Sequence, residues 1–84
     1  MSKYTGYVNT YIERKVIGFP VSQNQFDALT SFCYNRGSGR LRELVTDKDA
    51  AAVAEAMLSF IVINGEINEG LRRRREAERE LFLR

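Results

Sequence analysis

The chain has 84 residues, with 13 Lys and Arg against 11 Asp and Glu, so its formal net charge is only +2. A charge this small is no argument by itself for a nucleic-acid partner. A chain of this length buries roughly 60–65% of its unfolded surface, which allows one small core but not a two-lobed enzyme. With one cysteine and no histidine, the sequence lacks an internal disulfide and the usual zinc ligand sets. We therefore expect no metal and no cofactor.

The sequence also lacks the features of a membrane or secreted protein. Its longest apolar run, residues 60–63, is far shorter than a membrane span. The first residues, Met1 to Tyr4, lead into polar and aromatic side chains rather than an apolar signal segment. We expect no membrane association and a chain that stays in the cytoplasm where it is made.

The first predicted element is a helix over about residues 3–16. Its apolar residues recur at intervals of three and four, which is the period of one helix face. These residues are Tyr4, Tyr7, Val8, Tyr11 and Ile12. Pro20 then interrupts regular structure, because the residue before a proline is pushed toward extended backbone.

The second predicted helix has the clearest boundaries. Ser22 and Gln25 have the spacing of a capping box, and Val21 and Phe26 have the spacing of a hydrophobic staple. Gly37 provides the C-terminal stop. Cys33 lies within this helix and is predicted to pack in the core as a small apolar side chain.

The remaining elements are also predicted as helices. A short one covers about residues 39–45, and Thr46 or Asp47 caps a longer one that ends at Gly65. The alternative for the end of that helix is a β-hairpin about Asn64-Gly65, the strongest two-residue turn signal. Asn68 caps a last helix over about residues 69–83. The expected fold class is all-α, with about five helices in one small domain over residues 1–84.

Two segments resemble a known family. Gln23 to Gly39 reads QNQFDALTSFCYNRGSG, and Gly70 to Phe82 reads GLRRRREAERELF. They are similar to the QNQFDALxSFxxNxGSG and GLxxRRxxERxLF segments of phage-type lysozymes, the endolysins of tailed bacteriophages. The resemblance covers most of residues 5–83 and concerns the C-terminal lobe of these enzymes. It implies a lysozyme-like C-terminal lobe, and it implies that the N-terminal lobe with the catalytic acid is absent.

The resemblance also implies site residues. Residues matching Tyr34, Asn35 and Arg36 line the floor on which the glycan lies, although most members have a small apolar residue where Arg36 stands. An aromatic ring beside an amide suits sugars, because the ring stacks on apolar sugar faces and the amide bonds hydroxyl and N-acetyl groups. The alternative is that these residues only end a helix. In the family one arginine of the second segment points toward the catalytic glutamate, which leaves Arg72, Arg73, Arg74 and Arg75 as candidates.

No catalytic residue is predicted in this chain. Lysozyme-type hydrolysis needs a carboxylic acid and a second group on the other side of the sugar. In the family the catalytic glutamate is followed about nine residues later by Asp or Cys and then by Thr. No glutamate in this sequence is followed by these residues at that spacing. We expect all of the glutamates singled out to lie on solvated helix surface: Glu43, Glu55, Glu66, Glu69, Glu76, Glu78 and Glu80. The expected close pairs with the arginine run are Arg72–Glu76 and Arg74–Glu78.

These features predict a truncated or degenerate phage lysozyme, of the peptidoglycan muramidase family, whose remaining lobe forms the glycan-binding floor. Such enzymes act on the bacterial cell wall after release, and the sequence leaves open whether this chain is itself an enzyme. The first alternative is a module that binds wall glycan or a protein without catalysis. The second is a helix-turn-helix nucleic-acid binder with Arg36, Arg40 and Arg42 near its Gly-Ser-Gly turn.

The first helix carries a further prediction. By resemblance it matches the end of the family's connecting helix, which the other lobe flanks in a complete enzyme. Without that lobe, part of the apolar stripe of this helix would face water: Tyr4, Tyr7, Val8, Tyr11 and Ile12. Large exposed apolar patches usually mark interfaces, so the stripe predicts a two-fold homodimer. The alternative is that the helix folds back and buries its stripe within the monomer.

Overall fold

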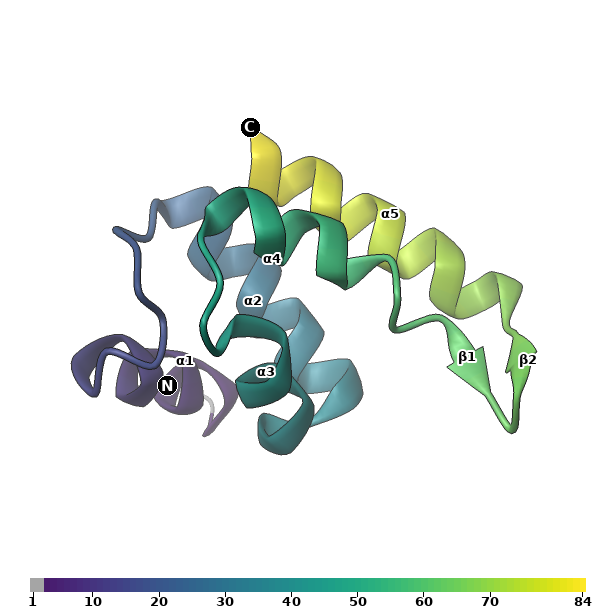
Figure 1. Ribbon diagram of the computed structural model, residues 1–84, viewed down its shortest axis with the longest axis horizontal. Coiled ribbons are helices and arrows are strands. Elements are labelled where there is room, and N and C mark those ends of the chain that lie inside the picture. The colour runs from purple at the N-terminus through teal and green to yellow at the C-terminus, as the bar shows by residue number, and fades with distance from the viewer. Residues whose placement is uncertain (1–2) are drawn as a thin grey trace.

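The computed structural model describes residues 3–84 as five helices and one small hairpin (Figure 1). The expected all-α class is confirmed. Met1 and Ser2 lie outside the described residues. The elements are α1 (Lys3–Glu13), α2 (Gln23–Arg36), α3 (Ser38–Val45), α4 (Ala50–Met57), β1 (Val62–Ile63), β2 (Glu66–Ile67) and α5 (Glu69–Leu83).

The predicted start and end of α2 are confirmed. The Ser22 side chain accepts a hydrogen bond from the backbone N–H of Gln25 (3.1 Å), and the Gln25 side chain accepts one from the N–H of Ser22 (2.8 Å). This reciprocal pair satisfies amides that the helix itself leaves free. Gly37 ends the helix with φ of 91°, a backbone conformation that favours glycine. Ser38 and Gly39 already belong to α3, so the Gly-Ser-Gly turn of the helix-turn-helix alternative is not formed.

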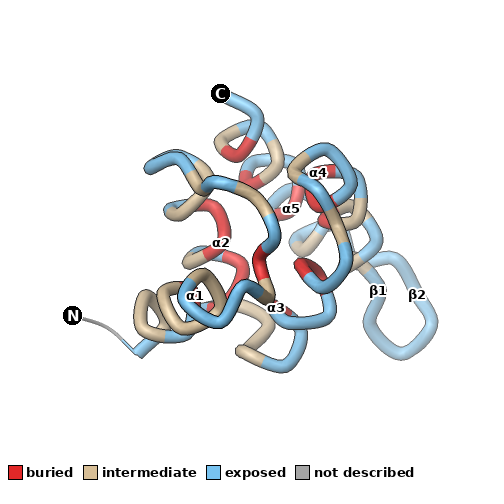
Figure 2. Tube along the Cα trace, turned by 60° about the vertical axis from the view of Figure 1, so that its left-hand side comes forward, coloured by how far each residue is buried: buried red, intermediate tan, exposed pale blue. Residues whose placement is uncertain are grey.

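The core forms around α2, which packs against α1, α3 and α5. Figure 2 shows the buried stretches where α2, α3, α4 and α5 face one another. Cys33 is fully buried, as predicted, and burial raises the pKa of its thiol. The Phe32 ring meets Phe60 edge to face, with centroids 5.0 Å apart. The buried apolar residues are Val8, Ile17, Ala28, Leu29, Phe32, Cys33, Leu41, Leu44, Val45, Val53, Ala54, Met57 and Phe82.

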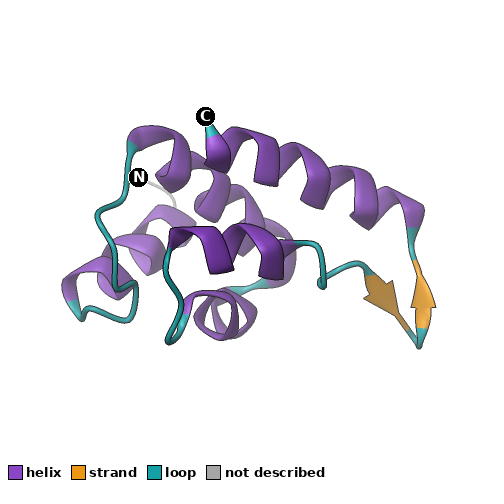
Figure 3. Cartoon of the chain, turned by 45° about the horizontal axis from the view of Figure 1, so that its top comes forward, coloured by secondary structure: helices purple, strands orange, loops and turns teal. Residues whose placement is uncertain are grey.

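The prediction that the fourth helix runs to Gly65 is wrong, and the hairpin alternative is correct. Helix α4 ends at Met57, and Val62 pairs with Ile67 in an antiparallel register. Asn64 and Gly65 both have positive φ (53° and 81°), as tight hairpin turns require. The β-branched run before this turn favours strand over helix. The hairpin projects beyond the N-terminal end of α5 (Figure 3).

The predicted N-cap of α4 is also wrong. Thr46 ends α3 instead, where its backbone N–H donates to Arg42. Asp47 adopts a positive φ of 56° in the turn that follows. Asp49 is the cap, and its side chain accepts from the N–H of Ala52 at 2.8 Å. At the start of α5, Asn68 accepts from the N–H of Leu71 at 2.9 Å, as predicted.

Helix α1 lies on the protein's own core, which removes the premise of the dimer prediction. Val8 is fully buried, and Tyr4, Tyr11 and Ile12 pack half-buried against the core. The Tyr11 hydroxyl donates to the carbonyl of Ser38 at 3.0 Å. Tyr7 is the most exposed of the five residues, at 39%. The alternative, burial of the stripe within the monomer, is therefore the one observed.

The end of α1 comes earlier than predicted, at Glu13 rather than residue 16. The backbone turns at Lys15, where φ is 59°. The N–H groups of Val16 and Ile17 both donate to the carbonyl of Tyr11, which closes the last turn. None of the helices within residues 3–84 is long and apolar enough to cross a membrane.

Candidate functional site

One face of α2 remains outside the core and carries two of the predicted floor residues. Ser31, Tyr34 and Asn35 are separated by three and four positions, so they share one helix face. We call these three residues the α2 stripe. Tyr34 is 67% exposed, Ser31 is exposed and Asn35 is half-buried. The stripe is bordered by α1 on one side and α5 on the other, as the contacts of Tyr34 and Ser31 show.

At the α1 edge two tyrosine rings meet. The rings of Tyr4 and Tyr34 pack edge to face, with centroids 5.1 Å apart and an angle of 76° between their planes. The ammonium group of Lys3 lies 5.3 Å from the centroid of the Tyr4 ring. Sequence patterns did not connect Tyr4 with the floor, because Tyr4 and Tyr34 come from different helices.

At the α5 edge a buried ion pair meets the stripe. The Ser31 hydroxyl donates to Oε2 of Glu78 at 2.6 Å, and Nη2 of Arg75 donates to the same oxygen at 3.0 Å. Nε of Arg75 lies 2.7 Å from Oε1 of Glu78. The Arg75 guanidinium carbon lies 4.8 Å from the centroid of the Phe32 ring.

This network corrects two predictions from the sequence. Glu78 is not solvated surface, because it is only 4% exposed, and its partner is Arg75 rather than Arg74. The physical reason is helical spacing. Arg75, Glu78 and Phe82 recur at intervals of three and four, so both charges lie on the face of α5 that packs against α2. The predicted pair of Arg72 with Glu76 is confirmed, at 3.1 Å.

Burial shifts the pKa values of both partners. Loss of solvent raises the pKa of Glu78, although the bonds from Ser31 and Arg75 oppose this shift. Burial also lowers the pKa of Arg75, against the attraction of Glu78. The positive charge of Arg36 also lowers the pKa of Arg75. Glu78 is thus a buried carboxyl that accepts hydrogen bonds from Ser31 and Arg75.

The four candidate arginines of α5 differ in burial and in their ion-pair partners. Arg75 is buried, and Arg73 is exposed. Arg72 points to the opposite side of α5 and is paired with Glu76.

Arg74 is the candidate next to the stripe. It is exposed and precedes Glu78 by one helical turn, while Asn35 follows Ser31 by one turn. Helices α2 and α5 run in opposite directions (Figure 1), so Arg74 and Asn35 each lie one turn from the Ser31–Glu78 contact, toward the same end of the helix pair.

Arg36 does not share the face of Tyr34 and Asn35. It comes two positions after Tyr34, which is about 200° around the helix, and one turn after buried Phe32. The side chain is half-buried, and its Nε is buried without a hydrogen-bond partner within residues 3–84. The predicted floor residue Arg36 therefore folds toward the core side of the helix end.

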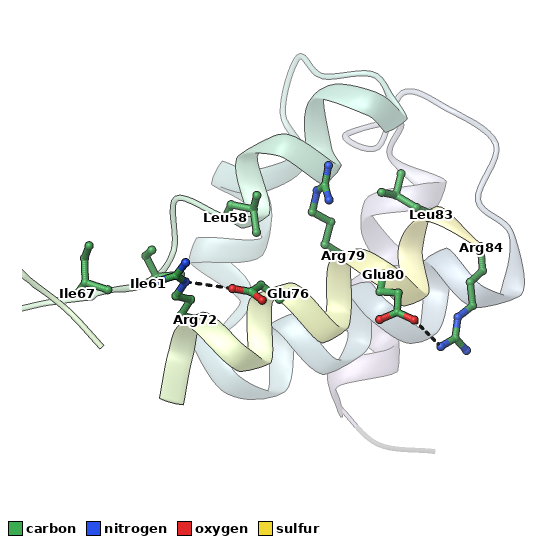
Figure 4. A pocket seen from close by; sticks show the side chains of 9 residues that line it. All are labelled: Leu58, Ile61, Ile67, Arg72, Glu76, Arg79, Glu80, Leu83 and Arg84. Carbon is green, nitrogen blue, oxygen red and sulfur yellow. Dashed lines mark hydrogen bonds and ion pairs between the residues drawn. The ribbon is translucent and has the colours of Figure 1, made fainter. Parts of the chain in front are cut away.

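A separate groove lies on the other side of α5 (Figure 4). Its volume is about 860 Å³, and its apolar lining comes from the end of α4, the hairpin and the end of α5. The charged lining includes the pairs Arg72–Glu76 and Glu80–Arg84. The sequence did not indicate this groove because it depends on the hairpin. The lining residues are Leu58, Ile61, Ile67, Arg72, Glu76, Arg79, Glu80, Leu83 and Arg84.

Comparison with known proteins gives the same family as the two sequence segments. The model of the family described as phage lysozyme matches residues 1–78. The endolysin of Bacillus phage B103 is 42% identical over 74 residues, which is 82% of this chain and 28% of the relative. The endolysin of Lactococcus phage c2 is 33% identical over 81 residues, which is 96% of this chain and 34% of the relative.

A third relative, the endolysin of Bacillus phage PZA, is 37% identical over 73 residues, or 81% of this chain and 28% of the relative. The chain thus spans about a third of the length of the curated relatives it matches. The family match covers α1 to α4, the hairpin and most of α5. On these findings the chain belongs to the phage lysozyme family.

Proposed function

We propose that this chain provides the glycan-binding floor of a muramidase cleft and does not cleave the glycan by itself. The observation that carries the proposal is the α2 stripe, where exposed Tyr34 stands beside Asn35 on a face that the core does not use. Membership of the phage lysozyme family supports peptidoglycan as the ligand and the bacterial cell wall as the place of action.

Each residue of the floor has a distinct role in this proposal. Tyr34 offers its ring to the apolar face of a sugar. Asn35, which is half-buried on the same face, offers amide hydrogen bonds to hydroxyl or N-acetyl groups. Arg74 is the arginine that faces an acidic group across the cleft, since it is exposed and lies one helical turn from the Ser31–Glu78 contact, toward the same end as Asn35.

The proposal that the chain is catalytically incomplete follows from the chemistry of glycoside hydrolysis. Cleavage needs one carboxylic acid at the glycosidic oxygen and a second group on the opposite face of the sugar. The Glu78 carboxyl contacts the α2 stripe through Ser31, but it is buried and held by Ser31 and Arg75. The acid would therefore come from a second lobe on another polypeptide segment. A retained lobe that only binds wall glycan is the alternative.

Binding is tested by co-sedimentation with purified peptidoglycan sacculi. We expect the parent chain to sediment with the sacculi, and Tyr34→Ala and Asn35→Ala to remain mostly in the supernatant. Ile67→Ala is the matched control, because it removes an exposed apolar side chain from the hairpin, on the groove side. Equal sedimentation of all four proteins would contradict the proposed floor.

Hydrolysis is tested separately by the loss of turbidity of the same sacculi. We expect no clearing by the parent chain, with Glu66→Gln and Glu69→Gln measured alongside. Clearing by the parent that disappears in either variant would show that the chain contains its own catalytic acid.

A further inference from the structure

We propose that Tyr4 is a positioning residue that holds the Tyr34 ring in the orientation that receives a sugar. The inference rests on the proposed glycan-binding floor and adds a residue from a different helix to it. It starts from the edge-to-face contact of the two rings, whose centroids are 5.1 Å apart. This geometry is an attractive arrangement for aromatic pairs, because the positive edge of one ring meets the negative face of the other.

The two rings differ in how firmly the protein holds them. Tyr34 is 67% exposed, so its ring has few other neighbours to fix its orientation. Tyr4 is half-buried and packs against the core. Its helix is anchored by fully buried Val8 and by the hydrogen bond from the Tyr11 hydroxyl to Ser38. Tyr4 is therefore the rigid partner, and Tyr34 is the ring whose orientation depends on the contact.

The surroundings of the two rings also differ in charge. The Lys3 ammonium group interacts with the Tyr4 ring at 5.3 Å from its centroid. A cation on an aromatic ring draws on the same electron-rich face that a sugar would use. Tyr34 takes part in no such cation contact within the described part of the chain. The sugar therefore stacks on the Tyr34 ring, and Tyr4 acts on binding only by orienting that ring.

A ring that is held before binding loses less conformational freedom when the glycan arrives. Removing Tyr4 should therefore weaken glycan binding without removing any group that touches the sugar. The expected loss is about two- to ten-fold in Kd, the factor that corresponds to the coupling of an aromatic pair. The loss should depend entirely on the presence of Tyr34.

The test is a double-mutant cycle with a β-linked tetramer of N-acetylglucosamine as the probe. Kd is measured by NMR titration for the parent, Tyr4→Leu, Tyr34→Ala and the double variant. We expect Tyr4→Leu to weaken binding in the parent background and to have no further effect in the Tyr34→Ala background. Tyr4→Phe keeps the ring and should bind as the parent does. Tyr7→Leu, the same change one turn along α1, is the matched control and should leave Kd unchanged.

A second readout separates positioning from general damage to the fold. The Tyr34 ring signals should lose their ring-current shift in Tyr4→Leu but keep it in Tyr4→Phe and Tyr7→Leu. If Tyr4→Leu loses helix content, Tyr4→Met replaces it, because methionine fills more of the ring's volume in the core.

The outcomes distinguish this inference from the proposed function. If Tyr34→Ala weakens binding but Tyr4→Leu does not, the positioning role of Tyr4 is overturned and the floor remains. An equal loss from Tyr4→Leu with and without Tyr34 also overturns it, since Tyr4 would then act on the glycan by another route. If Tyr34→Ala binds as the parent does, or if the parent does not bind, both proposals are overturned.

Discussion

The two sides of α5 use the same residue types in opposite ways. On the side facing α2, Arg75 and Glu78 form an ion pair with exposed fractions of 0% and 4%. On the groove side, Arg72 and Glu76 form a pair whose exposed fractions are 54% and 57%. Both pairs join residues three or four positions apart on one helix. Position around the helix, rather than the presence of a pair, decides how strongly these charges affect the stability of the fold.

The energetic consequences of the two environments differ in kind. An exposed pair gains little, because water screens the charges and two long side chains must be held in one geometry. A buried pair has lost its hydration, so removing one partner leaves the other charge in a dry environment without compensation. The α2 side of α5 should therefore be sensitive to single substitutions, and the groove side should be tolerant.

The largest expected effect is from Arg75→Met. It leaves Glu78 buried without its cation and should lower the free energy of unfolding by about 3–5 kcal/mol. Urea denaturation measures the loss. The double variant Arg75→Met/Glu78→Leu removes both charges and should recover most of it, because apolar replacements of a buried pair are often neutral or stabilising. A double variant as unstable as the single one would mean that packing, not the unpaired charge, causes the loss.

Ser31→Ala should have an intermediate effect. It removes the 2.6 Å hydrogen bond to the Glu78 carboxylate, and bonds to charged groups contribute about 1.5–3 kcal/mol. The same denaturation experiment measures it, with Thr30→Ser as a control that keeps a hydroxyl one position away. A change below about 0.5 kcal/mol would show that water replaces the serine and that the Glu78 carboxyl is less dry than its burial indicates.

The pH dependence of stability should carry the signature of Glu78. Because burial raises the pKa of this carboxyl, the folded protein binds its proton more tightly than the unfolded chain does. The contribution of Glu78 to stability is fully present below the ordinary glutamate value of about 4.3. It is lost as the pH rises from that value through the raised pKa. The difference in unfolding free energy between the parent and Glu78→Gln, followed from acidic to neutral pH, isolates this slope; the opposite slope would show that the attraction of Arg75 outweighs burial.

The smallest expected effect is from Arg72→Gln on the groove side. Its bonds to Glu69 and Glu76 are exposed, so the loss of stability should be no more than about 0.5 kcal/mol and should vanish in high salt. Thermal unfolding at low and high ionic strength measures both points. A loss comparable to that of Arg75→Met would remove the distinction between the two sides of α5.

The parts of the fold that depend on local chemistry were predictable from the sequence. The capping box at Ser22, the stop at Gly37 and the cap at Asn68 each involve residues a few positions apart, and each is present. The hairpin was the weaker of two local alternatives, because the alanine-rich run before it continues a helical pattern up to Phe60. Its turn residues decided the outcome, since both take positive φ.

The parts that depend on contacts between helices were not predictable in the same way. Glu78 looks like its neighbours Glu76 and Glu80 until the packing of α5 against α2 is known. The contact of Tyr4 with Tyr34 joins residues thirty positions apart in the chain, and no local pattern reports it. By contrast, helical spacing alone shows that Arg36 and Tyr34 lie on different faces of α2, so this difference could have been predicted from the sequence.

The most direct test of the account is an NMR map of the residues that respond to a β-linked tetramer of N-acetylglucosamine. Amide and side-chain signals should change at Ser31, Tyr34 and Asn35, with smaller changes at Tyr4, which contacts Tyr34, and at Arg74. Signals from the groove on the other side of α5, at Leu58, Ile67 and Leu83, should not move. Saturable changes at the groove residues with none along the α2 stripe would contradict it.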